Sequence, residues 1–274
     1  MLRMVLSDLD NTFLTPDKRI TQANAQILDA AYEHGIQFVP CTGRNLSAVP
    51  AELLAHPAVS YAISANGAII AEAKMGRILH AVEMDKTAAL SLYEQVEART
   101  VTFDVFADGK VYSNRKRFES LIERVPVDEA TRAFVRSSRT LVDQGEKDLI
   151  AHAQRFVRLT LFCLTEADHA FVCDAVDTQS SMARTQSIDC NVEVMDRSAN
   201  KGFGLRWLCS HVGIDPADTV AFGDNDNDRP MLEAAGDGVA VDNATAACKA
   251  AAYHMTASCS ESGVARYLAP LLGV

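Results

Sequence analysis

The 274-residue sequence predicts an α/β protein with a parallel sheet, into which a second, α+β domain is inserted. Strands and helices alternate near both ends of the chain, and this alternation is typical of parallel βαβ units. The middle of the chain instead combines helices with segments that alternate like antiparallel strands. We therefore expect a discontinuous core made of residues 1–83 and 193–274, and an inserted domain made of residues 84–192.

The first βαβ unit lies at the N-terminus. Residues 2–6 have the composition of a buried strand, and Thr21 is a suitable N-cap for an amphipathic helix. Gly35 is well placed to end that helix. Residues 36–39 are the next expected strand, so the two strands are parallel and joined by a right-handed crossover.

The C-terminal third continues the same alternation. The expected strands cover residues 219–222 and 238–241. One expected helix covers residues 201–211 and is followed by Gly213, two more cover residues 228–235 and 262–272, and another starts near residue 243. The middle of the chain differs, because residues 101–106 and 111–113 flank a hairpin turn at residues 107–110. Residues 156–164 are a further strongly β segment, which favours a separate α+β domain.

Charge and cysteine content exclude several classes of protein. Acidic residues outnumber basic ones by 36 to 26, a net charge of −10 that disfavours binding to nucleic acid or anionic membranes. The seven cysteines form no disulfide or zinc pattern, so we expect them to be reduced and mostly buried, in a cytoplasmic protein. No apolar run is long enough to span a membrane.

Four short polar segments fall at the carboxyl edge of the expected parallel sheet, where open α/β sheets bind their ligands. Asp8 and Asp10 follow the first strand, and one carboxylate could act as a nucleophile while the other moves a proton. Residues 42–44 (Thr-Gly-Arg) follow the second strand, where a hydroxyl and backbone N–H groups opening a helix would suit a phosphate. Taken singly, each segment also fits an ordinary polar turn or helix cap.

The other two segments lie in the C-terminal third. Lys201 begins an expected helix, where the helix dipole disfavours a cation, so an anionic group is expected to hold it there. Residues 223–228 (Gly-Asp-Asn-Asp-Asn-Asp) cluster the carboxylate and amide oxygens that Mg²⁺ prefers. A solvated lysine and a polar turn with Asp228 as N-cap are the plainer alternatives.

In combination and order, these segments resemble the haloacid dehalogenase (HAD) superfamily of phosphohydrolases. The resemblance covers residues 1–83 and 193–274, which implies a Rossmann-like core. It is closest to the Cof-type branch, which carries a large α/β cap inserted where residues 84–192 lie. Residues 66–68 (Asn-Gly-Ala) and 243–244 (Asn-Ala) are further signs of that branch.

The resemblance implies roles for individual residues. Asp8 would be the nucleophile and a ligand of Mg²⁺, and Asp10 would be the general acid/base that also offers its backbone carbonyl to the metal. Asp224 would be the further metal ligand, and Asp228 would support the metal or Lys201 from behind. The phosphoryl group would be held by the remaining members of the site: Thr42, Gly43, Lys201 and Asn227.

The expected function is Mg²⁺-dependent removal of phosphate from a small phosphorylated metabolite, such as a sugar phosphate or cofactor phosphate, through an aspartyl-phosphate intermediate. The inserted domain would choose the leaving group. Two alternatives stay open at this point: a sugar phosphomutase, which needs the same groups, and a non-catalytic protein that binds phosphorylated metabolites. No nucleic acid or membrane partner is expected, and the protein would be a monomer or a homodimer.

Overall fold

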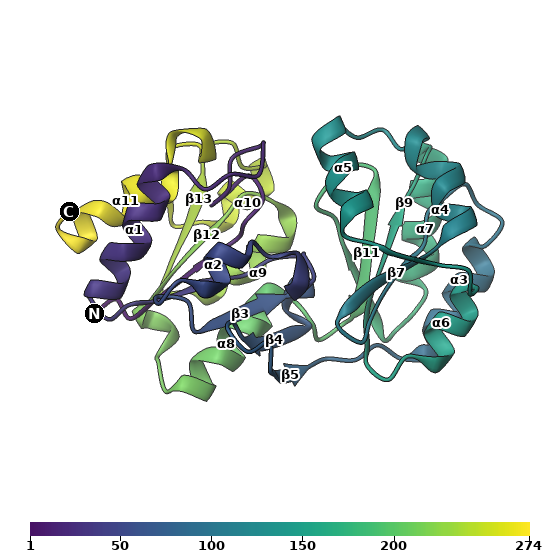
Figure 1. Cartoon of the computed structure of the whole chain (residues 1–274), viewed down its shortest axis with the longest axis horizontal. Coiled ribbons are helices and arrows are strands. Elements are labelled where there is room, and N and C mark those ends of the chain that lie inside the picture. Colours follow the sequence, from purple (N-terminus) through teal and green to yellow (C-terminus); the bar gives the residue numbers. More distant parts are fainter. The chain divides into compact units, whose positions relative to one another are not determined.

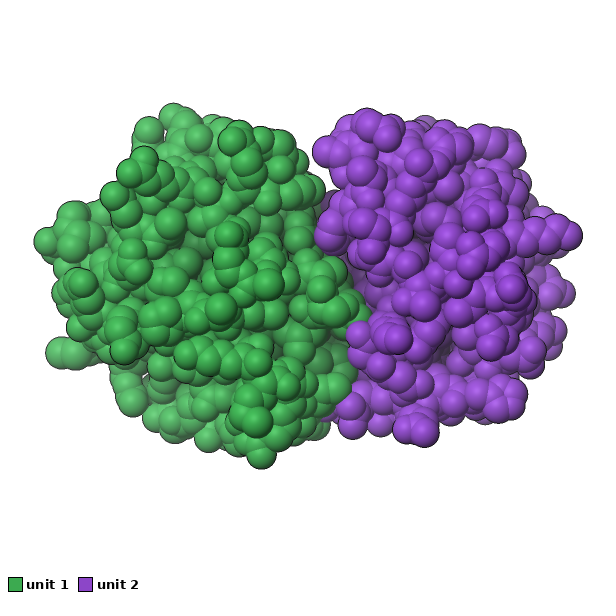
Figure 2. Space-filling model, viewed as in Figure 1, with its two compact units in different colours: residues 1–80, 200–274 green, residues 81–199 purple.

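The computed structural model describes all residues from 1 to 274 and divides into two compact units. One unit contains residues 1–80 and 200–274, and the other contains residues 81–199 (Figure 2). The chain therefore leaves the first unit once and returns to it. Strand β11 (Asn191–Asp196) pairs with β9 and β10, so it belongs wholly to the inserted unit.

A five-stranded parallel sheet forms the centre of the first unit, as the sequence predicts. Its strand order is β14-β13-β12-β1-β2, and every neighbouring pair is parallel. The central strand β1 pairs with strands on both sides, since Met4 lies opposite Thr219 and Gln37. The strands are β1 (Met4–Ser7), β2 (Gln37–Pro40), β12 (Thr219–Gly223), β13 (Asp237–Val241) and β14 (His254–Thr256).

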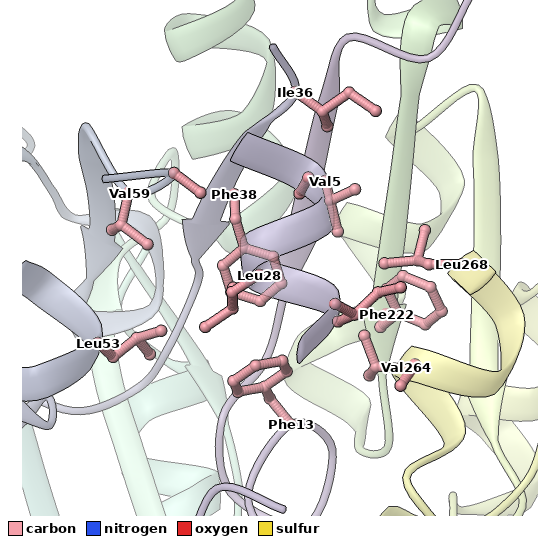
Figure 3. Close-up of a cluster of buried hydrophobic side chains, with 14 of the residues drawn as sticks. Val5, Phe13, Leu28, Ile36, Phe38, Leu53, Val59, Phe222, Val264 and Leu268 are labelled. Carbon is pink, nitrogen blue, oxygen red and sulfur yellow. The ribbon is translucent and has the colours of Figure 1, made fainter. Parts of the chain in front are cut away.

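Helices cover both faces of this sheet, because successive side chains of a strand point to opposite faces. Val5 of β1 packs with α1 and α11 on one face, where Phe13, Phe38 and Phe222 fill the core (Figures 1 and 3). Met4 and Leu6, on either side of Val5, pack on the other face, against α8, α9 and α10. The helices are α1 (Gln22–Glu33), α2 (Ala51–Ala55), α8 (Lys201–Val212), α9 (Arg229–Ala234), α10 (Ala246–Ala251) and α11 (Gly263–Leu272).

The capping signals expected from the sequence are present. The side chain of Thr21 accepts a hydrogen bond from the backbone N–H of Asn24, and Gly35 follows α1 with a φ of +66°. Gly213 ends α8 in the left-handed region. One expectation is wrong, because no α-helix opens at residues 42–44. Asn45 is extended and caps a single 3-10 turn at Leu46–Ala48, and α2 begins only after Pro50.

A small antiparallel sheet of β3 (Tyr61–Ser64), β4 (Ile69–Glu72) and β5 (Ile78–Ala81) follows β2. Between β3 and β4, three consecutive residues have positive φ: Ala65 (49°), Asn66 (56°) and Gly67 (92°). A left-handed turn of this kind is costly for residues with a side chain, so surrounding contacts must hold it in place. A methyl group at Gly67 would come within 2.1 Å of the carbonyl oxygen of Asn200, so this turn packs directly against the start of α8.

The inserted unit is an α+β domain around a six-stranded sheet of order β10-β11-β9-β6-β7-β8. All of its pairs are antiparallel except β7 with β8. Helices α3, α6 and α7 pack on one face of the sheet. The remaining elements are α3 (Lys86–Val96), α4 (Arg115–Leu121), α5 (Glu129–Ser137), α6 (Glu146–His152), α7 (Glu166–Asp177), β6 (Asp104–Ala107), β7 (Lys110–Asn114), β8 (Thr140–Val142), β9 (Phe156–Phe162) and β10 (Met182–Thr185).

The cysteines and the helices have features that the sequence predicts. All seven cysteines are free thiols and buried. None of the helices combines the length and the apolar character that crossing a membrane requires.

Replacing Gly67 by Ala should lower the free energy of unfolding by about 2–4 kcal/mol, because a side chain there meets both a positive φ and a backbone oxygen. Gly35→Ala is the matched control, since Gly35 also has a positive φ but open space around it. That variant should lose only about 1 kcal/mol. Urea unfolding of both variants checks this, and equal midpoints would contradict the packing argument.

Candidate active site

The carboxyl end of β1 places Asp8 at the sheet edge. Its backbone N–H donates to the carbonyl of Phe222 at 2.9 Å, so the parallel pairing with β12 continues into Asp8. The side chain is only 5% exposed. Asp8 is therefore a buried carboxylate on a rigid strand end.

Lys201 lies beside Asp8, although 193 residues separate them in sequence. Its ammonium nitrogen is 2.6 Å from Oδ1 of Asp8 and 2.5 Å from Oδ1 of Asp228, and the side chain is fully buried. Burial opposes the charge on Lys201, but the two carboxylates outweigh it and hold the pKa of Lys201 well above its usual value. The anionic groups that we expected to hold this lysine at the start of α8 are thus Asp8 and Asp228.

Asp228 also shapes the loop that follows β12. Its Oδ2 accepts hydrogen bonds from the backbone N–H groups of Asp224 at 2.9 Å and Asn225 at 3.0 Å. Gly223 has no space for a side chain, since a methyl group there would lie 2.3 Å from Cβ of Asp228. Asp228 is therefore not a simple N-cap of α9; it ties the loop to Lys201.

Three buried carboxylates meet in this region. Ligand oxygens of Asp8, Asp224 and Asp228 lie within 4.8 Å of one another. The hydroxyl of Thr12 donates to Oδ1 of Asp224 at 3.0 Å and fixes the orientation of that carboxylate. Because Lys201 is the cation held among them, the cluster of three acids and one lysine has an excess of negative charge.

The excess charge shifts the titration of the acids. Burial, together with the nearby carboxylates of Asp228 and Asp10, raises the pKa of Asp8 to about 7 despite Lys201. Burial and the charges of Asp8 and Asp228 raise the pKa of Asp224 to about 9. Hard oxygen donors at this spacing, in surroundings that oppose their charge, fit a divalent cation such as Mg²⁺.

The side chain of Asp10 contacts Arg44 and Lys18 rather than Lys201. Its carboxylate is not a member of the three-acid cluster, and it is bound by Arg44 at 2.8 and 2.7 Å and by Lys18 at 2.8 Å. Burial acts against its charge, but Arg44 and Lys18 lower the pKa of Asp10 to about 2. Arg44 and Lys18 therefore favour the ionised form of Asp10 in the substrate-free protein.

Thr42 and Gly43 follow β2 in a turn that is hydrogen-bonded to the 65–67 segment. Thr42 is 1% exposed, and its carbonyl accepts from the backbone N–H of Asn66 at 3.1 Å. Its hydroxyl accepts from the backbone N–H of Arg44 at 3.1 Å, as in a short polar turn. The same Asn66 accepts a hydrogen bond from the side-chain amide of Asn227 at 3.1 Å, so it links two of the expected phosphate-binding segments.

Sequence reasoning assigned no role to four residues that make these contacts. Asn66 and Arg44 lie inside segments that the sequence singled out, and Thr12 lies two residues after Asp10, so a local signal was available for them. Lys18 has no such signal, because its contact depends on a turn at residues 15–19 that brings it back to Asp10.

A basic segment, residues 115–117 (Arg-Lys-Arg), forms the start of α4 in the inserted unit. Arg117 pairs with the buried Glu146 at 2.9 Å and donates to the backbone carbonyls of Val101 and Glu97. These contacts give Arg117 a structural role inside the inserted unit.

Comparisons with known proteins agree with this architecture. The chain is 28% identical over 290 residues to the phosphatase YwpJ of Bacillus subtilis, covering 99% of this chain and 100% of that protein. It is 29% identical over 276 residues to an HMP-PP phosphatase of Cronobacter sakazakii, covering 98% and 95%. A solved haloacid dehalogenase-like hydrolase from B. subtilis superposes with a TM-score of 0.84 at 26% identity, covering 97% of this chain and 99% of that one.

The match to a whole family decides the assignment. Residues 5–268 fit the family described as haloacid dehalogenase-like hydrolase, and this range includes every site residue discussed above. The expected superfamily, the fold with its cap and the enzyme class are confirmed. The chain belongs to the haloacid dehalogenase-like hydrolase family.

Proposed function

We propose that this protein is a Mg²⁺-dependent phosphohydrolase that releases phosphate from a small phosphorylated metabolite through an aspartyl phosphate on Asp8. The observation that carries the proposal is the buried cluster of Asp8, Asp224 and Asp228 around Lys201. A nucleophilic carboxylate, oxygen ligands for a cation and a fixed ammonium group are the parts that phosphoryl transfer needs in one place. The phosphatases among its relatives support the same reaction class.

The metal would be held by side chains of Asp8 and Asp224, with the backbone carbonyl of Asp10 as a further ligand. Mg²⁺ bound there would neutralise negative charge on the phosphoryl group and on the carboxylates. The raised pKa values of Asp8 and Asp224 support this assignment, because they indicate two carboxylates that lack enough positive charge nearby. Asp228 has its oxygens engaged by Lys201 and by two backbone N–H groups, so we assign it to support of Lys201.

Asp8 would attack phosphorus with one carboxylate oxygen while the bond to the leaving oxygen breaks, and the leaving oxygen would take a proton from Asp10 in its protonated form. Lys201 would hold a phosphoryl oxygen next to Asp8, together with the hydroxyl of Thr42, the backbone N–H of Gly43 and the side-chain amide of Asn227. Water would then attack phosphorus and release inorganic phosphate, which restores the Asp8 carboxylate.

Asp10 would serve as the base that takes a proton from that water. Its ionised form, bound to Arg44 and Lys18, suits this step. Donation of a proton to the leaving oxygen in the first step requires the protonated form, which Asp10 would regain when it takes the proton from water. Arg44 and Lys18 favour the ionised form in the substrate-free protein. A general acid or base contributes about 10²–10⁴ to a rate, so most of the acceleration must come from positioning and charge neutralisation.

The inserted unit, expected at residues 84–192, would select the leaving group. We propose a small phosphorylated metabolite as the substrate class, in keeping with the HMP-PP phosphatase among the relatives. The acidic net charge of −10 makes nucleic acid a poor substrate.

Asp8→Asn should reduce phosphate release by on the order of 10⁴-fold or more, because an amide is not a nucleophile for phosphorus. The measurement is phosphate release from a panel of phosphorylated sugars and cofactor precursors, with Mg²⁺ or with a chelator, and the chelator should abolish it. Asp29→Asn is the control, since Asp29 is an exposed side chain of α1. Turnover that survives in Asp8→Asn would refute the nucleophile, and transfer to a second hydroxyl would indicate a mutase.

The metal-free protein should lose stability as pH rises from 5 to 9. Asp8 and Asp224 have raised pKa values, so the folded state binds more protons than the unfolded state above pH 4, and stability is lost toward the folded pKa values of about 7 and about 9. Each group contributes a slope of up to about 1.4 kcal/mol per pH unit.

Urea unfolding in a chelator at pH 5, 7 and 9 measures this slope. Asp224→Asn should flatten it, and Mg²⁺ added to the wild-type protein at pH 9 should raise the unfolding midpoint. An equal slope in the wild type and in Asp224→Asn would show that this carboxylate is not the titrating group.

A further inference from the structure

The contact between Arg44 and Asp10 has the geometry of a two-point clamp. Nε of Arg44 donates to Oδ2 of Asp10 at 2.8 Å, and Nη2 donates to Oδ1 at 2.7 Å. A planar guanidinium that binds both oxygens fixes the plane of the carboxylate as well as its position. Asp10 therefore has one defined orientation in the substrate-free protein.

Arg44 is itself held at both ends. Its Nη1 donates to the carbonyl of Ala48 at 2.9 Å, and its side chain is 7% exposed. On the backbone, its N–H donates to Thr42 Oγ1 and its carbonyl accepts from Ala65 at 2.9 Å. These contacts leave the guanidinium little freedom to turn from Asp10 toward another anion.

Lys18 adds a second cation, but with a different character. Its Nζ lies 2.8 Å from Oδ1 of Asp10, and its side chain is 25% exposed. A single ammonium contact balances charge without fixing the plane of the carboxylate. The orientation of Asp10 thus depends on Arg44 rather than on Lys18.

We propose that Arg44 is a positioning residue that acts through Asp10, and that it is not a ligand of the phosphoryl group. The inference rests on the proposed function, since it concerns the step in which Asp10 takes a proton from water. The phosphate seat expected at residues 42–44 uses the hydroxyl of Thr42 and backbone N–H groups, and it leaves the side chain of Arg44 without a role. Arg44 instead directs a carboxylate oxygen, and a small rotation of that group would misplace it for proton transfer.

A double-mutant cycle tests the proposal, with Arg44→Gln, Asp10→Asn and the combined variant. The substrate is the panel member that the wild type hydrolyses fastest. We expect Arg44→Gln alone to lower kcat on the order of 10²-fold, with little change in KM or in inhibition by inorganic phosphate. In the Asp10→Asn background the same substitution should change kcat by less than about two-fold, because its target is already lost.

Two results would overturn the proposal. If the fold-losses in kcat of the two single variants multiply in the double variant, Arg44 acts independently of Asp10. If inorganic phosphate inhibits Arg44→Gln ten times more weakly than the wild type, Arg44 binds the phosphoryl group. Arg44→Lys provides a variant that keeps the charge but cannot bind both oxygens, and its kcat should fall between those of the wild type and Arg44→Gln. Wild-type turnover in Arg44→Lys would also overturn the clamp.

Controls separate folding and function. Arg19→Gln removes an exposed arginine that pairs with Asp17, and it should leave kcat unchanged. If Arg44→Gln does not fold, as judged by thermal unfolding, the cycle is run with Arg44→Lys. A wild-type protein that hydrolyses nothing in the panel refutes the proposed function and this inference together. If the wild type turns over, Asp8→Asn abolishes that turnover, and the effects of Arg44→Gln and Asp10→Asn on kcat are independent, only the inference is refuted.

Discussion

The placement of one buried lysine among three buried carboxylates constrains the rest of this site. Lys201 is fully buried and touches Asp8 and Asp228, while Asp224 lies within reach of both acids. Leaving such charges unpaired inside a protein costs several kcal/mol per ion, so the surrounding loops must hold all four side chains close together. The remaining excess of negative charge is what makes the region suited to a cation.

Close backbone contacts hold these side chains in place. Gly67 allows the 65–67 turn to touch Asn200, and Gly202 allows α8 to approach the carbonyl of Pro230 at the start of α9. A side chain at either glycine would push the start of α8, and therefore Lys201, away from the sheet edge. The costly left-handed turn at Ala65 and Asn66 is retained because it binds the backbone of residues 42–44.

Asp8 and Asp10 are two residues apart and yet have opposite surroundings. Asp8 faces burial and other carboxylates, and its pKa rises to about 7, whereas Asp10 faces Arg44 and Lys18, and its pKa falls to about 2. Environments that separate the titration of two neighbouring acids are a common way to give them different roles. Strict alternation would direct two residues this far apart to the same side. Strand β1 ends at Ser7, however, and the chain turns after it, so the two carboxylates reach different partners.

The sequence alone determined the elements that depend on local periodicity and caps, such as β1, α1 with its N-cap Thr21, and α8 ended by Gly213. It also determined the family, because Asp8, Asp10, Lys201 and the 223–228 loop carry recognisable motifs. Only the tertiary structure decided which groups meet: Lys201 with Asp8 across 193 residues, Arg44 with Asp10 across 34, and Asn227 with Asn66 across 161. A local pattern specifies dihedral angles and exposed faces over a few turns, whereas partners so far apart in sequence are set by strand order and packing, which act on the whole chain at once.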